Sequence, residues 1–178
     1  MKWKIVHLHR KTVKFEDMLL SPYLIPFDLE ELKLPDSLSA NSLIARRIHF
    51  FSSEEEPDLS MYDLAIIGVP ESRNAFENSA ASLAPDEIRR QFYKLYSWNT
   101  PVRMIDLGNI VLGATVEDTY HLVSDILAHL IANNVIPIIL LLSNDFSYAN
   151  YLAYKKLEQV VNVVAVDSRF DIGNENLP

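Results

Sequence analysis

Cysteine is absent from the 178-residue chain, which excludes disulfide bonds, thiolate zinc sites, iron–sulfur clusters and a nucleophilic cysteine. Only four glycines occur, and the chain contains neither a Walker phosphate loop nor a G-x-G-x-x-G turn, which disfavours nucleotide binding. Basic residues number 16 against 24 acidic residues, giving a formal net charge of −8. A broad phosphate-binding surface is therefore not expected, and nucleic acid is excluded as the main partner.

Long hydrophobic runs are also missing. The longest apolar run, residues 135–142, is too short to cross a bilayer. The first stretch, MKWKIVHLHRK, has no uninterrupted apolar segment of the kind that a secretory signal needs. We therefore expect no membrane partner and a cytoplasmic location. Hydrophobic residues make up 49% of the chain and charged residues 22%, values typical of a folded globular protein.

The chain is expected to divide near residue 60. Residues 1–60 contain several prolines and predict an irregular N-terminal segment with one or two short strands, for which 4–8 and 45–51 are the candidates. Residues 61–178 alternate apolar runs with amphipathic stretches and predict a partial α/β domain.

Strands and helices alternate in the second part of the chain. Apolar runs predict buried strands over 64–69, 102–107, 135–142 and 161–166. Helices are expected between them, beginning at Pro85, after the capping pair Thr115 and Asp118, and over 147–157. This β-α-β-α-β-α-β order predicts a three-layer αβα fold with a mainly parallel sheet.

The apolar stripes of two helices can be placed from their spacing. Ile88, Phe92 and Leu95 are predicted to face the sheet from the first helix. In the second helix the predicted inward residues are Val123, Ile126, Leu127, Leu130 and Ile131.

Polar side chains follow each predicted strand, at the end of a parallel sheet where ligands and chemistry collect. Asp167 and Asp171 could share a divalent cation; the alternative is that Asp167 caps a turn and Asp171 pairs with Arg169. Asp145 could join the two carboxylates or cap the helix that follows it. The other candidates for lining a site here are Glu71, Asn109, Ser143, Asn144 and Arg169.

Five segments, in the right order, resemble motifs of the ureohydrolase family, which includes arginase, agmatinase and formimidoylglutamase. They are Gly68-Val69-Pro70 for a strand end, Ala84-Pro85-Asp86-Glu87-Ile88-Arg89 for a helix start, Asp106-Leu107-Gly108-Asn109 for Asp-x-Gly-Asp, Leu141-Leu142-Ser143-Asn144 for Gly-Gly-Asp-His, and Asp167-Ser168-Arg169-Phe170-Asp171 for Asp-Ala-His-x-Asp. The likeness covers residues 62–173 and is nearest to the formimidoylglutamase-like branch. It implies the first half of an arginase/deacetylase-like fold.

The resemblance implies two manganese ions that deprotonate a water for hydrolysis of a C–N bond in formimino or guanidino compounds. Asn144 and Arg169 stand where the family has metal-binding histidines, and arginine cannot ligate a cation. Only the vestigial ligands Asp167 and Asp171 remain, and the family's later Asp-x-Asp ligands have no match. We therefore expect no metal cofactor and no catalytic residue in this chain.

Two functional hypotheses stay open. The chain is a ureohydrolase-family protein that is degenerate and inactive as it stands, or it is a non-catalytic binding or assembly module on the same fold. Either could bind a small formimino or guanidino ligand. A third hypothesis, an unrelated doubly wound domain that binds an anion at a helix N-terminus, is disfavoured because no phosphate loop is present.

A homo-oligomer is expected from the strand over 135–142. The resemblance implies that strands of the family's second half separate it from the strand over 161–166, and this chain lacks them. Both strands are apolar on both faces, so neither suits an exposed edge. We expect the two strands to pair directly, within an oligomer of at least two chains.

Overall fold

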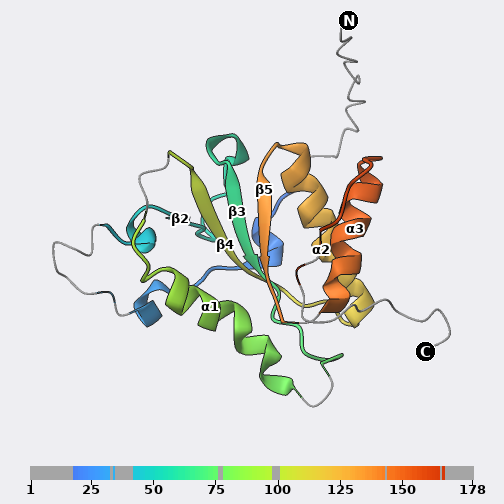
Figure 1. Ribbon diagram of the computed structural model, residues 1–178, viewed down its shortest axis with the longest axis horizontal. Helices are drawn as coiled ribbons and strands as arrows, with labels where there is room; N and C mark the ends of the chain where they lie inside the picture. The colour runs from blue at the N-terminus through green and yellow to red at the C-terminus, as the bar shows by residue number, and fades with distance from the viewer. Residues whose placement is uncertain are drawn as a thin grey trace, which may run out of the picture.

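The computed structural model describes residues 18–32, 34, 42–75, 78–97, 101–142, 144–164 and 166. A five-stranded sheet lies at the centre, with helices on both faces (Figure 1). The three-layer αβα arrangement predicted from the alternation of strands and helices is therefore confirmed.

Four of the five strands run parallel. β3 (Leu64–Gly68) is central and pairs with β4 (Met104–Ile110) on one side and β5 (Ile136–Leu140) on the other. β2 (His49–Phe50) pairs in parallel with the start of β4, whereas β1 (Leu24–Ile25) pairs antiparallel with the end of β4. Two short strands from the N-terminal part of the chain thus share one edge of β4. The strand predicted over 45–51 is reduced to β2, because a 3-10 turn occupies Ile44–Arg46.

Helices α2 (Val116–Ala132) and α3 (Ser147–Lys156) pack against each other on one face of the sheet, and α1 (Ala84–Phe92) lies on the other (Figure 1). Short 3-10 helices complete the described structure at Ser21–Tyr23, Leu29–Leu32, Ile44–Arg46, Leu59–Met61, Ser79–Leu83 and Asn144–Phe146. No helix within the described ranges is both long and apolar enough to cross a membrane.

Alternation along the strands divides the core in two. Ala65, Ile67 and Val69 join the cluster beneath α2 and α3, whereas Ile66 joins the cluster beneath α1. The second cluster also receives Phe27, Leu32, Ile44, Ala45 and Ile48 from the N-terminal part. Residues 18–60 therefore supply both an edge of the sheet and part of one helical layer.

The start and inner face of α2 are confirmed. The Thr115 side chain accepts a hydrogen bond from the Asp118 N–H, and the Asp118 carboxylate accepts one from the Thr115 N–H. This reciprocal pair satisfies two amides that the first turn of the helix leaves free. The residues predicted to face the sheet from α2 are buried, with Ile131 partly so.

The predicted apolar stripe of the first helix is confirmed for Phe92, which packs partly buried against the second cluster, and is wrong for Ile88 and Leu95. Ile88 and Leu95 are 40% and 53% exposed, and the buried residues of the helix are Pro85 and Arg89. The spacing of apolar residues predicted the wrong inner face for α1, because the side chain that this helix buries deepest is Arg89, which is hydrogen-bonded to buried polar groups.

The predicted strand over 161–166 is also wrong for the residues described there. Residues 161–164 and 166 have no regular secondary structure, and Val163 and Val164 are 81% and 87% exposed. Within the described residues β5 pairs with β3 alone, so the expected direct pairing of β5 with 161–166 is not found. β5 is not buried on both faces either, since Ile136 is 62% exposed. The strand predicted over 4–8 lies outside the described residues.

The capping pair of α2 can be tested by mutation. Thr115→Ala removes the acceptor for the Asp118 amide and should lower the free energy of unfolding by about 1 kcal/mol. Thr115→Ser keeps the hydroxyl and serves as the matched control. Urea denaturation followed by circular dichroism measures both, and equal losses in the two variants would contradict the cap.

Candidate functional site

A buried guanidinium joins α1 to the carboxyl end of β4. Arg89 is 0% exposed, and all five of its N–H groups have acceptors. Nε and Nη2 donate to the two Asp106 carboxylate oxygens at 2.8 and 2.9 Å, and Nη2 also donates to the Gly108 carbonyl at 2.8 Å. Nη1 donates to Asn109 Oδ1 at 2.6 Å and to Asp86 Oδ1 at 3.1 Å. The fork geometry of arginine is therefore fully used within the fold.

The Asp106 carboxylate is also surrounded by donors. Besides Arg89, it accepts hydrogen bonds from the Tyr93 hydroxyl and from the Gly108 N–H at 2.8 Å. Burial raises the pKa of Tyr93 well above its usual range, and the Asp106 charge raises it further. Burial opposes the charge of Arg89, but the hydrogen bonds and charge of Asp106 outweigh it and raise the Arg89 pKa. Tyr93 therefore stays neutral and Arg89 stays charged, which suits a structural role.

The predicted lining residue Asn109 lies inside this network. Its Oδ1 accepts from Arg89, and its Nδ2 donates to Asp86 Oδ1 at 2.9 Å. Gly68 on the neighbouring strand makes room for it, because a Cβ at Gly68 would overlap Asn109 Oδ1 and lie 2.7 Å from Arg89 Nη1. The side chain of Asn109 thus has both of its polar groups engaged.

Glycine is required at position 108 for a different reason. Gly108 has φ +77°, in the left-handed region, and a Cβ there would collide with the Ile25 carbonyl of β1. This conformation directs the Gly108 N–H to the Asp106 carboxylate.

Glu71, after β3, is almost fully buried and bound to Arg73. Arg73 Nε lies 3.0 and 3.1 Å from the two Glu71 oxygens, and Nη2 donates to Oε2 at 2.6 Å. The Ser72 and Arg73 amides donate to Oε1 at 3.0 and 2.8 Å. These hydrogen bonds, with Arg73 first among them, lower the Glu71 pKa. Glu71 is therefore held ionised.

Arg73 also joins the loop after β3 to the start of α2. It donates to the Ala114 and Thr115 carbonyls at 2.9 and 3.2 Å and to Thr119 Oγ1 at 3.1 Å. The Glu71–Arg73 pair therefore ties two loops at the carboxyl end of the sheet.

Asp145, after β5, is bound to Tyr120 of α2. The Tyr120 hydroxyl donates to Asp145 Oδ2 and accepts from Asn74 Nδ2 at 3.4 Å. Burial and the Asp145 hydrogen bond raise the Tyr120 pKa to about 12. The second oxygen, Oδ1, is buried and has no hydrogen-bond partner among the described residues. The alternative that Asp145 caps the following helix is wrong, because the residue before α3 is Phe146 and no described side chain caps that helix.

The candidate residues fall into separate groups. Glu71 and Asp145 both connect to α2. Glu71 does so through Arg73, which donates to Thr119, and Asp145 accepts directly from Tyr120, the next residue of the helix. No hydrogen bond or ion pair between described residues links either of them to Asn109. Ser143, Asp167, Arg169 and Asp171 lie outside the described residues, as does the side chain of Asn144.

The positions that the resemblance matches to the family's manganese ligands lie outside the described residues, apart from the backbone of Asn144. The part of the chain that the structure describes contains no group of three or more His, Asp or Glu residues placed to hold a metal ion. At the matching positions, Arg169 carries a fixed positive charge and Asn144 offers only an amide in place of an imidazole. We therefore derive no reaction step through a metal ion.

Sequence reasoning missed Arg89, Asp106, Tyr93, Arg73 and Tyr120. A signal for the first pair was present. Asp106 stands within an otherwise apolar strand, and a charged residue there requires a buried partner. Arg89 follows Pro85 by four residues, so the two share a helix face.

Parallel strands, helices on both faces and polar side chains at the strand ends define an α/β domain of three layers. The family model of the arginase family matches residues 62–177, and the chain belongs to that family. No curated protein matches the chain.

Solved structures give partial likenesses. One is an arginase superfamily protein from Trypanosoma cruzi, with 21% identity, a TM-score of 0.48 and coverage of 56% of this chain and 39% of that one. Another is oxidized formiminoglutamase from the same organism, determined with Mn²⁺ at pH 8.5, with 21% identity, a TM-score of 0.49 and coverage of 55% and 38%. The chain therefore corresponds to well under half the length of these proteins.

The buried pair at Arg89 predicts a large loss of stability when one partner is neutralised. Asp106→Asn removes the buried counter-charge of the guanidinium, leaving only the partly exposed Asp86, and should cost about 3–5 kcal/mol of unfolding free energy. Arg103→Gln breaks the exposed pair with Asp63 and is the control, for which we expect a far smaller change. Similar losses in both variants, measured by urea denaturation, would show that burial of the network contributes little.

The lowered pKa of Glu71 predicts a pH dependence. The stability contributed by ionised Glu71 is fully present above the pKa of an unfolded glutamate and is lost as pH falls through the lower folded pKa. The stability gap between the natural chain and Glu71→Gln should therefore narrow between about pH 6 and pH 3. Thermal unfolding across this range measures the gap, and a constant gap would contradict the ionised pair.

Proposed function

We propose that this chain is an arginase-family protein related to formimidoylglutamases that, as it stands, does not hydrolyse C–N bonds. The observation that carries the proposal is the donor set at the family's metal positions. Asn144 and Arg169 replace two histidines, and only Asp167 and Asp171 keep ligand chemistry. Two carboxylates beside a guanidinium form a charge-compensated group that has little tendency to collect divalent cations.

The described acidic groups near the strand ends support the proposal. Asp106 is neutralised by Arg89, Glu71 by Arg73, and Asp145 accepts from Tyr120. A hydrolase needs a base that can take a proton from water, or a metal that lowers the water pKa. Glu71, whose pKa is lowered by its hydrogen bonds with Arg73, is a poor base, and the Asp106 carboxylate is enclosed by Arg89 and Tyr93, so both fit positioning better than catalysis.

The alternative proposal is a binding or assembly module on the same fold. Asp145 Oδ1 favours binding, because a carboxylate oxygen that has no hydrogen-bond partner among the described residues would gain one from a planar formimino or guanidino cation. Assembly into a homo-oligomer and a cytoplasmic location are further parts of the proposal. Gel filtration and cell fractionation address those two parts.

The activity proposal has a direct assay. The purified chain, loaded with excess manganese, is given formimidoylglutamate, arginine or agmatine, and formamide or urea release is measured beside an active arginase. We expect no release above background. Asn144→His with Arg169→His should not restore activity, because the family's later Asp ligands have no counterpart in the chain. Turnover by the folded natural chain, or rescue by the double variant, would overturn the proposal.

Ligand binding is tested separately by calorimetry with the same three compounds. If the module binds one of them through Asp145, Asp145→Asn should weaken binding about tenfold, the value of one charge-assisted hydrogen bond. Asp125→Asn, which removes an exposed carboxylate paired with Lys156, is the control. Binding that is equally strong in both variants would exclude Asp145 as the contact, and no binding at all would favour assembly over ligand recognition.

A further inference from the structure

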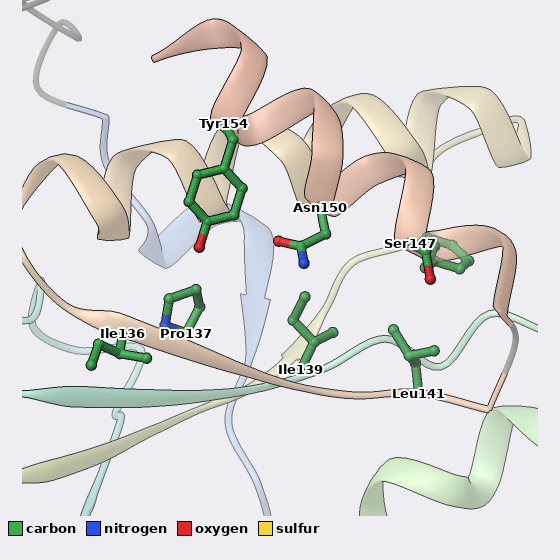
Figure 2. Close-up of a pocket in the computed structure, with 8 residues that line it drawn as sticks. Ile136, Pro137, Ile139, Leu141, Ser147, Asn150 and Tyr154 are labelled. Carbon is green, nitrogen blue, oxygen red and sulfur yellow. The ribbon is translucent and has the colours of Figure 1, made fainter. Parts of the chain in front are cut away.

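The outer edge of β5 is open. In the described sheet β5 is the last strand, paired with β3 on one side only. α3 runs above it and leaves a groove of about 370 Å³ between helix and strand. Figure 2 shows Ile139 and Leu141 below this groove and Asn150 and Tyr154 of α3 above it. An unpaired strand edge beside a groove is a template for another strand.

The hydrogen bonds of β5 show which residues face that edge. The Ile136 N–H donates to the Asp63 carbonyl at 2.9 Å, and the Leu140 carbonyl accepts from the Val69 N–H at 2.9 Å. Residues 136, 138 and 140 therefore direct their backbone groups to β3. Because backbone groups alternate along a strand, residues 137, 139 and 141 direct theirs outward.

Pro137 limits what this edge can accept. Proline has no N–H, and here the missing donor lies on the outer side, where it does not interrupt the ladder with β3. The edge offers the Pro137 and Ile139 carbonyls and the Ile139 and Leu141 N–H groups. A parallel strand with two inward-facing residues satisfies all four groups. If the β5 strands of two copies paired antiparallel, the residue opposite Pro137 would lack a hydrogen-bond donor, because proline has no N–H.

The same chain carries an exposed segment with strand character. Four valines near its start are almost fully exposed, so their apolar surface would be stabilised by burial: Val160 at 102%, Val163 at 81%, Val164 at 87% and Val166 at 99%. β-Branched residues fit a pleated sheet better than an irregular conformation. The segment follows α3 closely, through a turn at Glu158 with φ 51°.

We propose that the outer edge of β5 accepts the segment 160–164 of a second copy of this chain as a parallel strand. Each copy has one such edge and one such segment, so the exchange is reciprocal and closes as a two-fold dimer. In this dimer the turn at Glu158 after α3 is the hinge from which the segment crosses to the β5 of the second copy. The dimer covers the edge and buries the valines in one step.

Light scattering tests the assembly. At about 50 µM we expect a mass of two chains, since exchanged strands give a dimer well populated in the micromolar range. Val163→Lys with Val164→Lys should give a monomer, and because both side chains are exposed the change should leave the fold intact. Leu83→Lys with Leu95→Lys adds the same charge at exposed leucines on the α1 side and should remain dimeric. A monomeric natural chain, or a dimer that survives the segment variant, would overturn the proposal.

Cysteine crosslinking distinguishes strand pairing between two copies from strand pairing within one chain. The chain has no cysteine, so Asn150→Cys in the groove can be combined with Val163→Cys or with Val164→Cys, one for each face of the strand. Mild oxidation should give a covalent dimer for one combination, visible on a non-reducing gel. A disulfide-closed monomer, which would mean pairing within one chain, contradicts the proposal, as does the absence of a disulfide in both.

Discussion

The buried ion pair between Arg89 and Asp106 is the constraint on which the described structure depends. It fastens α1 to β4, and the Gly108 carbonyl and Asn109 side chain bring the last residues of that strand into the same network. Breaking such a pair leaves an uncompensated charge inside the protein, so the fold can hold it only with every hydrogen bond in place. All five guanidinium donors are in fact used.

The pair also organises the N-terminal layer. The Arg89 guanidinium lies 5.5 Å from the centre of the Phe27 ring, and Tyr93, which donates to Asp106, packs edge-on against Phe27 and Phe50. The N-terminal part of the chain, irregular in its secondary structure, is therefore fixed by aromatic contacts to a polar centre. The Asp106 carboxylate thus contacts α1 through Arg89 and the aromatic layer through Tyr93.

Local signals were enough to predict much of the fold. The capping pair of Thr115 and Asp118 and the apolar stripe of α2 involve residues within a few positions of one another, and both are confirmed. The short strands β1 and β2 could not be predicted in the same way. Each is two residues long and exists only because β4, far along the chain, provides its partner.

The failures have physical causes too. Ile88 and Leu95 were predicted to face the sheet because the spacing of apolar residues gives no sign that a charged residue is buried. Arg89 is buried because Asp106, 17 residues away, neutralises its charge. The segment 161–166 has the composition of a buried strand, but composition does not supply the neighbour that a strand needs. At the candidate site, Glu71, Asn109 and Asp145 were recognised as strand-end residues, but their partners were not. Arg89 and Tyr120 lie 20 and 25 residues away from Asn109 and Asp145, whereas Arg73 follows Glu71 by two residues.

Hydrogen exchange at the Gly108 amide tests the central role of the buried pair most directly. This N–H donates to the Asp106 carboxylate, so its protection reports on the network itself. Native-state exchange followed by NMR with increasing denaturant should show Gly108 exchanging only through global unfolding, with the free energy of the slowest amides of β3 and β4. Exchange of Gly108 through a local opening of much lower free energy would show that the network is a dispensable contact rather than the centre of the fold.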